Sequence, residues 1–293
     1  MQLKLNINGS AEPFIKYLED FYRIRQDLLL EIDPTEQRFV CKISTDARSC
    51  VRYSSIKFEE CNMSIISHTG SEELQNERIK AGILSQLNKF ISIIKRFSTN
   101  SDKDGNVNFN IVINYDKLIN ADKSIDYIAT KLACVSDILT MRIDGFRISE
   151  LVYIDDNKFN TVVFGVEDPV TFQMDANTIN SLIKNSDIMK SDDRTDAIIF
   201  YNKDREIWAK SIIKEGMDPT FEYKIGDLNE DPTYNINFSV RKKNFTTMLN
   251  KTDEDYTVII GRRTNSLGQL MIDRILFKSL CSDTKIAIAI INE

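Results

Sequence analysis

The sequence predicts an α+β protein of two similar domains, in each of which antiparallel sheets carry two helices on one face. Three observations support this fold class. Strand patterns dominate the chain, only four segments have the length and periodicity of helices, and the order of strands and helices recurs in the two halves. The length of 293 residues fits two domains of about 150 residues each.

The repeat has two parts. Residues 75–97 and residues 235–251 each read as a short strand that runs into a basic, amphipathic helix. Residues 5–43 and residues 170–213 each read as a strand, a helix and a two-stranded hairpin. Two units that follow one another in the same order in each half predict two domains of the same fold.

A polar break marks the predicted boundary between the halves. The run Asp155-Asp156-Asn157-Lys158 interrupts the apolar pattern there. We therefore expect an N-terminal domain over residues 1–153, a linker over residues 154–161 and a C-terminal domain over residues 162–293.

Each of the four helical windows, residues 11–25, 85–97, 175–190 and 241–251, has one apolar stripe and one polar face. A helix with a single apolar stripe has only one face to bury. Both helices of a half are therefore expected to cover the same face of a sheet. Asp175 is expected to cap the third helix, because its carboxylate can accept from free amides of the first turn.

Basic residues are concentrated in these windows. The whole chain has a net charge of −6, yet the four windows together contain twelve basic and five acidic residues. The second and fourth windows contain no acidic residue at all. The net charge alone argues against a nucleic-acid-binding protein, but this distribution predicts basic helices on an acidic body.

Residues typical of catalytic and metal sites are scarce. The five cysteines include no C-x-x-C pair, so buried reduced thiols are expected rather than a zinc site. The one histidine, His68, belongs to no recognised nucleophile motif, and the chain has no glycine-rich phosphate-binding motif. We expect neither an enzyme nor a cofactor.

No apolar run approaches the roughly 18 residues of a membrane span, and the first residues lack the pattern of a signal peptide. We therefore expect no membrane association and a location in the cytoplasm.

The repeated pattern, with basic helices on an acidic body, resembles the DNA sliding clamps. It is most similar to the phage-type and proliferating-cell-nuclear-antigen-type clamps, which have two domains per subunit. Residues 233–261 resemble the strand, fourth helix and following strand of this family, and residues 175–189 resemble the helix that opens its second domain. Residues 124–135 stand where the family has an edge strand used for subunit contact. The resemblance spans almost the whole chain in order, and implies the DNA clamp fold.

The resemblance implies a ring, often a trimer for two-domain subunits, whose hole is lined by the helices. Lysine and arginine side chains there would contact phosphates, which carry no sequence information, so that the ring slides. The expected DNA contacts are Lys16, Arg23, Lys89, Arg96, Lys184, Lys243 and Lys251. Lys16 and Arg23 are weaker candidates because Glu19 and Asp20 share their helix. An ordinary solvated helix face is the alternative for each residue.

Two protein-binding surfaces are also implied. Subunits would pair through edge strands, expected at Ile125–Cys134 and Thr220–Gly226, with contacts from Ile125, Tyr127, Ala129, Phe221, Tyr223 and Ile225. A partner peptide would dock in an apolar pocket formed by Leu151, Tyr153, Ile154, Ile288 and Ile290. Ordinary sheet membership and core packing are the alternatives.

The function predicted from the resemblance is that of a DNA polymerase processivity factor, of viral or phage type. It would encircle double-stranded DNA without sequence preference, bind a DNA polymerase and a clamp loader, and form a homo-oligomer. Two alternatives stay open: a processivity subunit of the same fold that does not close into a ring, and a structural β-rich viral protein without clamp activity.

Overall fold

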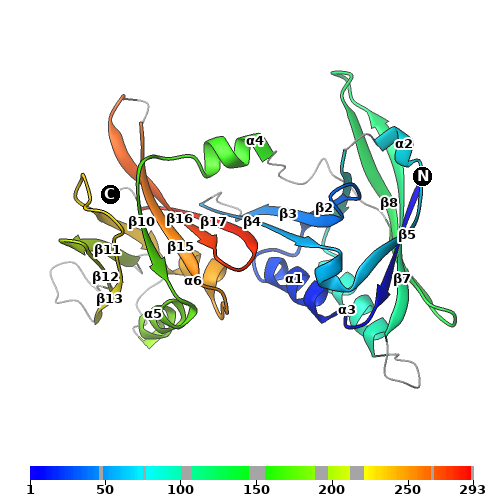
Figure 1. Ribbon diagram of the computed structural model, residues 1–293, viewed down its shortest axis with the longest axis horizontal. Coiled ribbons are helices and arrows are strands. Elements are labelled where there is room, and N and C mark those ends of the chain that lie inside the picture. Colours follow the sequence, from blue (N-terminus) through cyan, green and yellow to red (C-terminus); the bar gives the residue numbers. More distant parts are fainter. Residues whose placement is uncertain are drawn as a thin grey trace. The chain divides into compact units, whose positions relative to one another are not determined.

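The computed structural model describes residues 1–45, 49–74, 77–99, 107–144, 156–188, 197–211, 221–264 and 267–291. The chain divides into two compact units (Figure 1). Unit 1 consists of Met1–Ile43 and Tyr53–Tyr153, and unit 2 of Ser44–Arg52 and Ile154–Glu293. Both units combine extensive antiparallel sheets with few helices, which confirms the predicted α+β class.

Unit 1 begins with a strand and a helix and ends with three strands. Its elements are β1 (Gln2–Asn8), α1 (Glu12–Tyr22), β2 (Leu28–Asp33), β3 (Arg38–Ser44), β4 (Cys50–Lys57), η1 (Glu59–Cys61), β5 (Met63–Thr69), α2 (Ser71–Leu74), β6 (Ile79–Ile83), α3 (Leu87–Ser98), β7 (Asn108–Ile119), β8 (Ile125–Val135) and β9 (Thr140–Asp144). The strand order is β4-β3-β2-β6-β8-β7-β1-β5, with β9 also paired to β8. The β6–β8 pair is parallel and short.

Alternation along the strands builds the core of unit 1. On β1, Leu3, Leu5 and Ile7 are fully buried, while the residues between them point the other way. The helices bury their aromatic stripes against the same sheet. Phe14 of α1 stacks on Phe39 of β3 with ring centroids 4.6 Å apart.

Unit 2 repeats this architecture. Its elements are α4 (Asp156–Lys158), η2 (Phe159–Val163, a π-helix), β10 (Glu167–Met174), α5 (Ala176–Ile188), β11 (Ala197–Lys203), β12 (Glu206–Ser211), β13 (Phe221–Asp227), β14 (Asn237–Arg241), α6 (Lys242–Leu249), β15 (Tyr256–Thr264), β16 (Leu270–Ser279) and β17 (Asp283–Ala289). The strands form the orders β10-β15-β16-β17 and β13-β12-β11-β14. The described part of the predicted linker is helical, in α4 and the start of η2.

The helices of unit 2 join its two groups of strands. Phe245 of α6 lies 6.0 Å from the ring of Phe200 on β11 and 5.9 Å from that of Phe277 on β16. At the start of α5, the amide of Thr178 donates to Asp175 Oδ1 at 2.6 Å, which confirms the predicted cap. All four predicted helical windows form helices, as α1, α3, α5 and α6.

A short excursion, residues 44–52, leaves the N-terminal part of the chain and joins unit 2. The amide of Ala289 donates to the Ser49 carbonyl at 2.7 Å, and Asn244 Nδ2 donates to Ser49 Oγ at 3.1 Å. The predicted domain boundary near residue 153 therefore does not separate the two units completely, because residues 44–52 belong to unit 2. Among the described helices, none is long and apolar enough to cross a membrane.

Candidate nucleic-acid interface and protein-binding surfaces

The seven side chains expected to contact DNA are all exposed. Lys89 and Arg96 lie two helical turns apart on α3, so they share one face, and the buried stripe of α3 occupies the other. Neither forms an ion pair with any residue that the structure describes. Within the described part of the chain, the charges of both side chains are therefore available to an anionic ligand.

The cations of α1 differ, because acidic residues stand beside them. Arg23 pairs with Asp20 one turn away at 3.4 Å. Glu19 of α1 accepts a hydrogen bond from Lys95 of α3 at 2.6 Å, and this bond raises the pKa of Lys95. The contact fastens the two helices to one another and compensates part of their positive charge.

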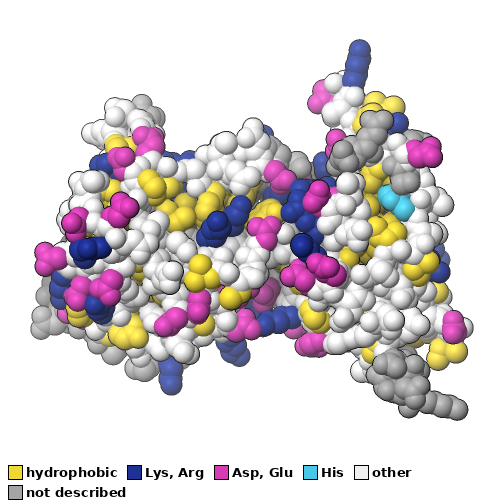
Figure 2. Space-filling model, in the orientation of Figure 1, with side chains coloured by type: hydrophobic (Ala, Val, Ile, Leu, Met, Phe, Trp, Pro, Cys, Tyr) yellow, Lys and Arg dark blue, Asp and Glu magenta, His cyan; other side chains and the backbone are white. Residues whose placement is uncertain are grey.

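In unit 2, α5 and α6 pack together and expose Lys184 and Lys243. Lys242 is buried instead, and its ammonium donates to the Ser186 carbonyl at the end of α5. Lys251, counted in the predicted fourth helix, lies beyond the end of α6 at a φ of 57°, where it is exposed. Figure 2 shows basic side chains projecting from the lower border of unit 2, where Figure 1 draws α5 and α6.

The assignment of Ile125–Cys134 to an edge strand is wrong. This segment is β8, which pairs with β7 on one side and with β6 and β9 on the other. Tyr127 and Ala129 are accordingly buried in the core, and only Ile125, at 41% exposure, reaches the surface. The chain turns back after β8 through a hydrogen bond from the Ser136 amide to the Leu139 carbonyl, and the returning strand β9 takes the outer position.

Five strands have a ladder partner on one side only among the described residues, namely β5, β9, β10, β13 and β14. Of these, β9 pairs with β8, and β13 pairs with β12. On β13, Phe221 and Tyr223 are half-buried and Ile225 is buried, so their side chains face the interior of unit 2. The backbones of β9 and β13 present unpaired amides and carbonyls along their outer sides.

A cavity of about 610 Å³ lies in unit 2, beside the strand β14. Its apolar lining is Ile199, Phe238, Leu270, Met271, Ile272, Ile290 and Ile291. Ile290 is thus one of the predicted pocket residues at a cavity. Ile288 is wholly buried in the core and does not line it. The predicted pocket residues Leu151, Tyr153 and Ile154 lie outside the described residues. The lining residues come from six separate stretches of the chain, which no local pattern of the sequence connects.

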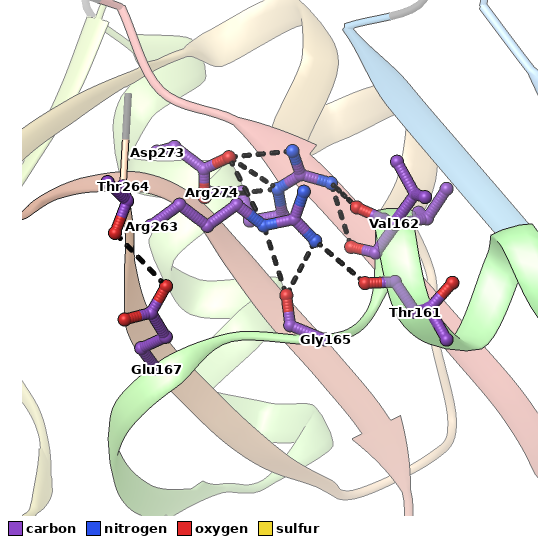
Figure 3. Close-up of polar contacts among 9 residues, drawn as sticks. Thr161, Val162, Gly165, Glu167, Arg263, Thr264, Asp273 and Arg274 are labelled. Carbon is purple, nitrogen blue, oxygen red and sulfur yellow. Dashed lines mark hydrogen bonds and ion pairs between the residues drawn. The ribbon is translucent and has the colours of Figure 1, made fainter. Parts of the chain in front are cut away.

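A pair of arginines fixes the segment that opens unit 2 (Figure 3). Arg274 Nη1 donates to the carbonyls of Val162, at 3.2 Å, and Val163, at 2.8 Å, at the end of η2. Arg263 Nε donates to the Gly165 carbonyl at 3.0 Å. The Asp273 carboxylate receives three hydrogen bonds from its neighbour Arg274, two from Nε and one from Nη2, and lies 3.7 Å from Arg263.

Burial and, next, the charge of Arg274 lower the pKa of Arg263. Close packing supports this arrangement, since a Cβ on Gly261 would lie 2.3 Å from the Cβ of Val166. These arginines satisfy carbonyls that η2 leaves without an intrahelical donor. We refer to Arg263, Asp273 and Arg274 as the arginine cluster.

The described residues contain no group of three or more His, Cys, Asp or Glu side chains placed to hold a metal ion. His68 Nε2 lies 2.7 Å from the hydroxyl of Tyr115, and burial lowers the pKa of the histidine. Burial raises the pKa of the Cys50, Cys61 and Cys134 thiols to about 12, so that these thiols stay protonated at neutral pH.

No protein-family model matches the chain, and no curated protein matches it in sequence. Solved structures do match it in fold. PCNA from A. fulgidus, in complex with the C-terminal region of FEN-1, is 11% identical, with 99% of each chain covered and a TM-score of 0.59.

Bacterial clamps match over part of their own length. The Helicobacter pylori beta clamp, bound to a DNA ligase peptide, is 14% identical with a TM-score of 0.60, and 99% of this chain covers 66% of that one. The DNA polymerase sliding clamp of Bacillus subtilis is 12% identical with a TM-score of 0.60, and 100% of this chain covers 66% of that one. The fold of the protein is therefore that of the DNA sliding clamps.

Proposed function

We propose that the protein is a sliding clamp that encircles duplex DNA as a ring and holds a DNA polymerase on its template. The observation that carries the proposal is the pairing of helices in each unit. α1 with α3, and α5 with α6, bury aromatic and aliphatic stripes and expose lysine or arginine on the opposite face. On a clamp fold these faces meet the phosphates of the duplex.

The chemistry of these faces suits sliding. Lysine and arginine bind phosphate by charge, and phosphate contacts carry no base information. Exposed side chains such as Lys89, Arg96 and Lys243 make contacts that break and re-form as the duplex moves. Retention then depends on ring topology and not on high affinity for any one site.

Ring closure needs a pair of complementary edges, and β9 and β13 supply one. Antiparallel pairing of β9 from one subunit with β13 from the next would satisfy the unpaired backbone groups of both. We propose a homo-oligomer closed in this way, with three subunits as the expected number. β13 keeps its predicted role, while β9 replaces β8.

Partner proteins would dock at the cavity beside β14. Its apolar lining and its size are those of a site for a few side chains of a peptide. Two of the similar clamp structures hold peptide segments of other proteins, from FEN-1 and from DNA ligase. We propose that the polymerase and a clamp loader use this cavity in turn.

The test combines mass and topology. We expect a defined oligomer by light scattering, and a protein loaded onto nicked circular DNA that is lost when the circle is cut. The reversals Lys89→Glu and Lys243→Glu should reduce retention and DNA synthesis while the circular dichroism spectrum is preserved. Equal loss from circular and linear DNA would instead identify a processivity subunit that does not close into a ring.

A further inference from the structure

One lysine in the cavity beside β14 has no carboxylate partner among the described residues. Lys210 of β12 lines the cavity and is half-buried. It forms no ion pair with any residue in the described ranges. Its ammonium lies 4.8 Å from the ring centroid of Tyr201, which is a cation–π contact and supplies no negative charge. A half-buried cation without a counter-ion has lost hydration that the protein itself does not replace.

The nearest acid on the same sheet face is already occupied. Glu222 of β13 stands directly across from Lys210 in the register of the two strands. Its carboxylate accepts a hydrogen bond from Lys203 at 2.8 Å and another from the hydroxyl of Tyr201. Lys203 is therefore paired with the Glu222 carboxylate, which would otherwise be the cross-strand partner of Lys210.

The remaining lining of the cavity adds no negative charge. Arg262, the other cation, is paired with Asp168 and lies over the ring of Tyr234 at 4.4 Å. The other polar residues of the lining are Tyr234, Asn235, Asn237 and Ser239, and the two asparagines are exposed. Among the described residues, no aspartate or glutamate lines the cavity. Apolar lining residues beside one available cation define the chemistry of a complementary ligand.

We propose that the cavity selects partner peptides in which an acidic side chain stands next to the apolar anchor residues, and that Lys210 pairs with that carboxylate. The inference rests on the proposed function only in that partner proteins dock at this cavity. Apolar side chains occupy the space lined by Met271, Ile272 and Ile290, and the acid selects among peptides with similar anchors.

The test starts from a random peptide library selected for binding to the wild-type protein, with no free peptide carboxyl terminus. The best binder is synthesised with an amidated C-terminus, together with its Asp→Asn or Glu→Gln counterpart. Both peptides are then titrated against the wild type and against Lys210→Met, which keeps the aliphatic stem. We expect the wild type to prefer the acidic peptide about tenfold, as a charge-assisted hydrogen bond predicts. This preference should disappear in Lys210→Met and return in Lys210→Arg.

Lys224→Met is the matched control, because Lys224 lies on the same sheet face as Lys210, pairs with Glu206 and Asp227, and does not line the cavity. It should retain the preference of the wild type. A library without enrichment of acidic residues, or a preference that survives in Lys210→Met, would overturn the inference.

Met271→Asp separates this inference from the proposed function. It should abolish binding of both peptides, since it places a charge among the apolar side chains that line the cavity. If peptides still bind this variant, the cavity is not the docking site and the role of Lys210 is refuted. Ring formation and retention on circular DNA, measured on the same variants, report independently whether the protein is a clamp.

Discussion

Lys89 and Arg96 of α3 and the two arginines of the arginine cluster use their charges in opposite ways. Lys89 and Arg96 are exposed and form no ion pair with any described residue. Arg263 and Arg274 are three-quarters or more buried in their side chains, and they donate to carbonyls and to Asp273. The acceptors around a cation, more than its position in the sequence, therefore decide whether the cation is available to bind a ligand.

The largest expected effect is on stability, from the arginine cluster. Arg274→Ala leaves the carbonyls of Val162 and Val163 without a donor and should lower the free energy of unfolding by about 1–3 kcal/mol. Hydrogen exchange should increase at residues 159–165 first. Arg96→Ala, on the exposed face of α3, should stay within about 0.5 kcal/mol of the wild type. Equal losses in the two variants, measured by urea denaturation, would show that the buried and the exposed arginine contribute alike to stability.

An effect on DNA binding is expected from α3 and not from the arginine cluster. Replacing both Lys89 and Arg96 by alanine removes two phosphate contacts, so the slope of log K against log salt should become shallower by about 2. The measurement is fluorescence anisotropy of a labelled duplex over a range of salt concentrations. The pair Lys16→Ala and Arg23→Ala on α1 should change the slope less, since Asp20 already compensates Arg23. The hypothesis fails if the α1 pair has the larger effect.

The smallest expected effect concerns the ion pair between Glu19 of α1 and Lys95 of α3. Glu19→Gln removes the carboxylate that holds Lys95 and should convert Lys95 from a paired to an available cation. DNA affinity should rise slightly, with a salt slope steeper by about 1. The stability change should be below about 1 kcal/mol, because exposed ion pairs contribute little. An unaltered salt slope would show that Lys95 does not face the duplex.

Local patterns were sufficient to predict the four long helices, the α+β class and the cap at Asp175. Each depends on residues close together in the chain, such as the stripe of α3 or the carboxylate one turn from Thr178. Pairing between distant segments was not accessible in the same way. The alternation in β8 fits an edge strand or a central one equally well, and only the return of β9 decides between them.

The arginine cluster and the cavity illustrate the same limit. Arg263 donates to the carbonyl of Gly165, 98 residues away in the chain. A sequence does not indicate which backbone carbonyl will accept a hydrogen bond from a distant side chain. Lys210 looks like any strand lysine until the register with Glu222 and the ion pair of Lys203 are known. Sequence patterns identify which residues are charged, whereas the choice of partner is a property of the folded chain.

The excursion of residues 44–52 has a practical consequence for dissecting the molecule. A gene truncated to begin after residue 153 would encode a fragment that lacks Ser49, the acceptor for Ala289 and Asn244. The complementary fragment would contain residues 44–52 without their partners in unit 2. Neither half is a self-contained unit for expression. A circular permutant or a split version of the protein would have to keep residues 44–52 together with the C-terminal strand β17.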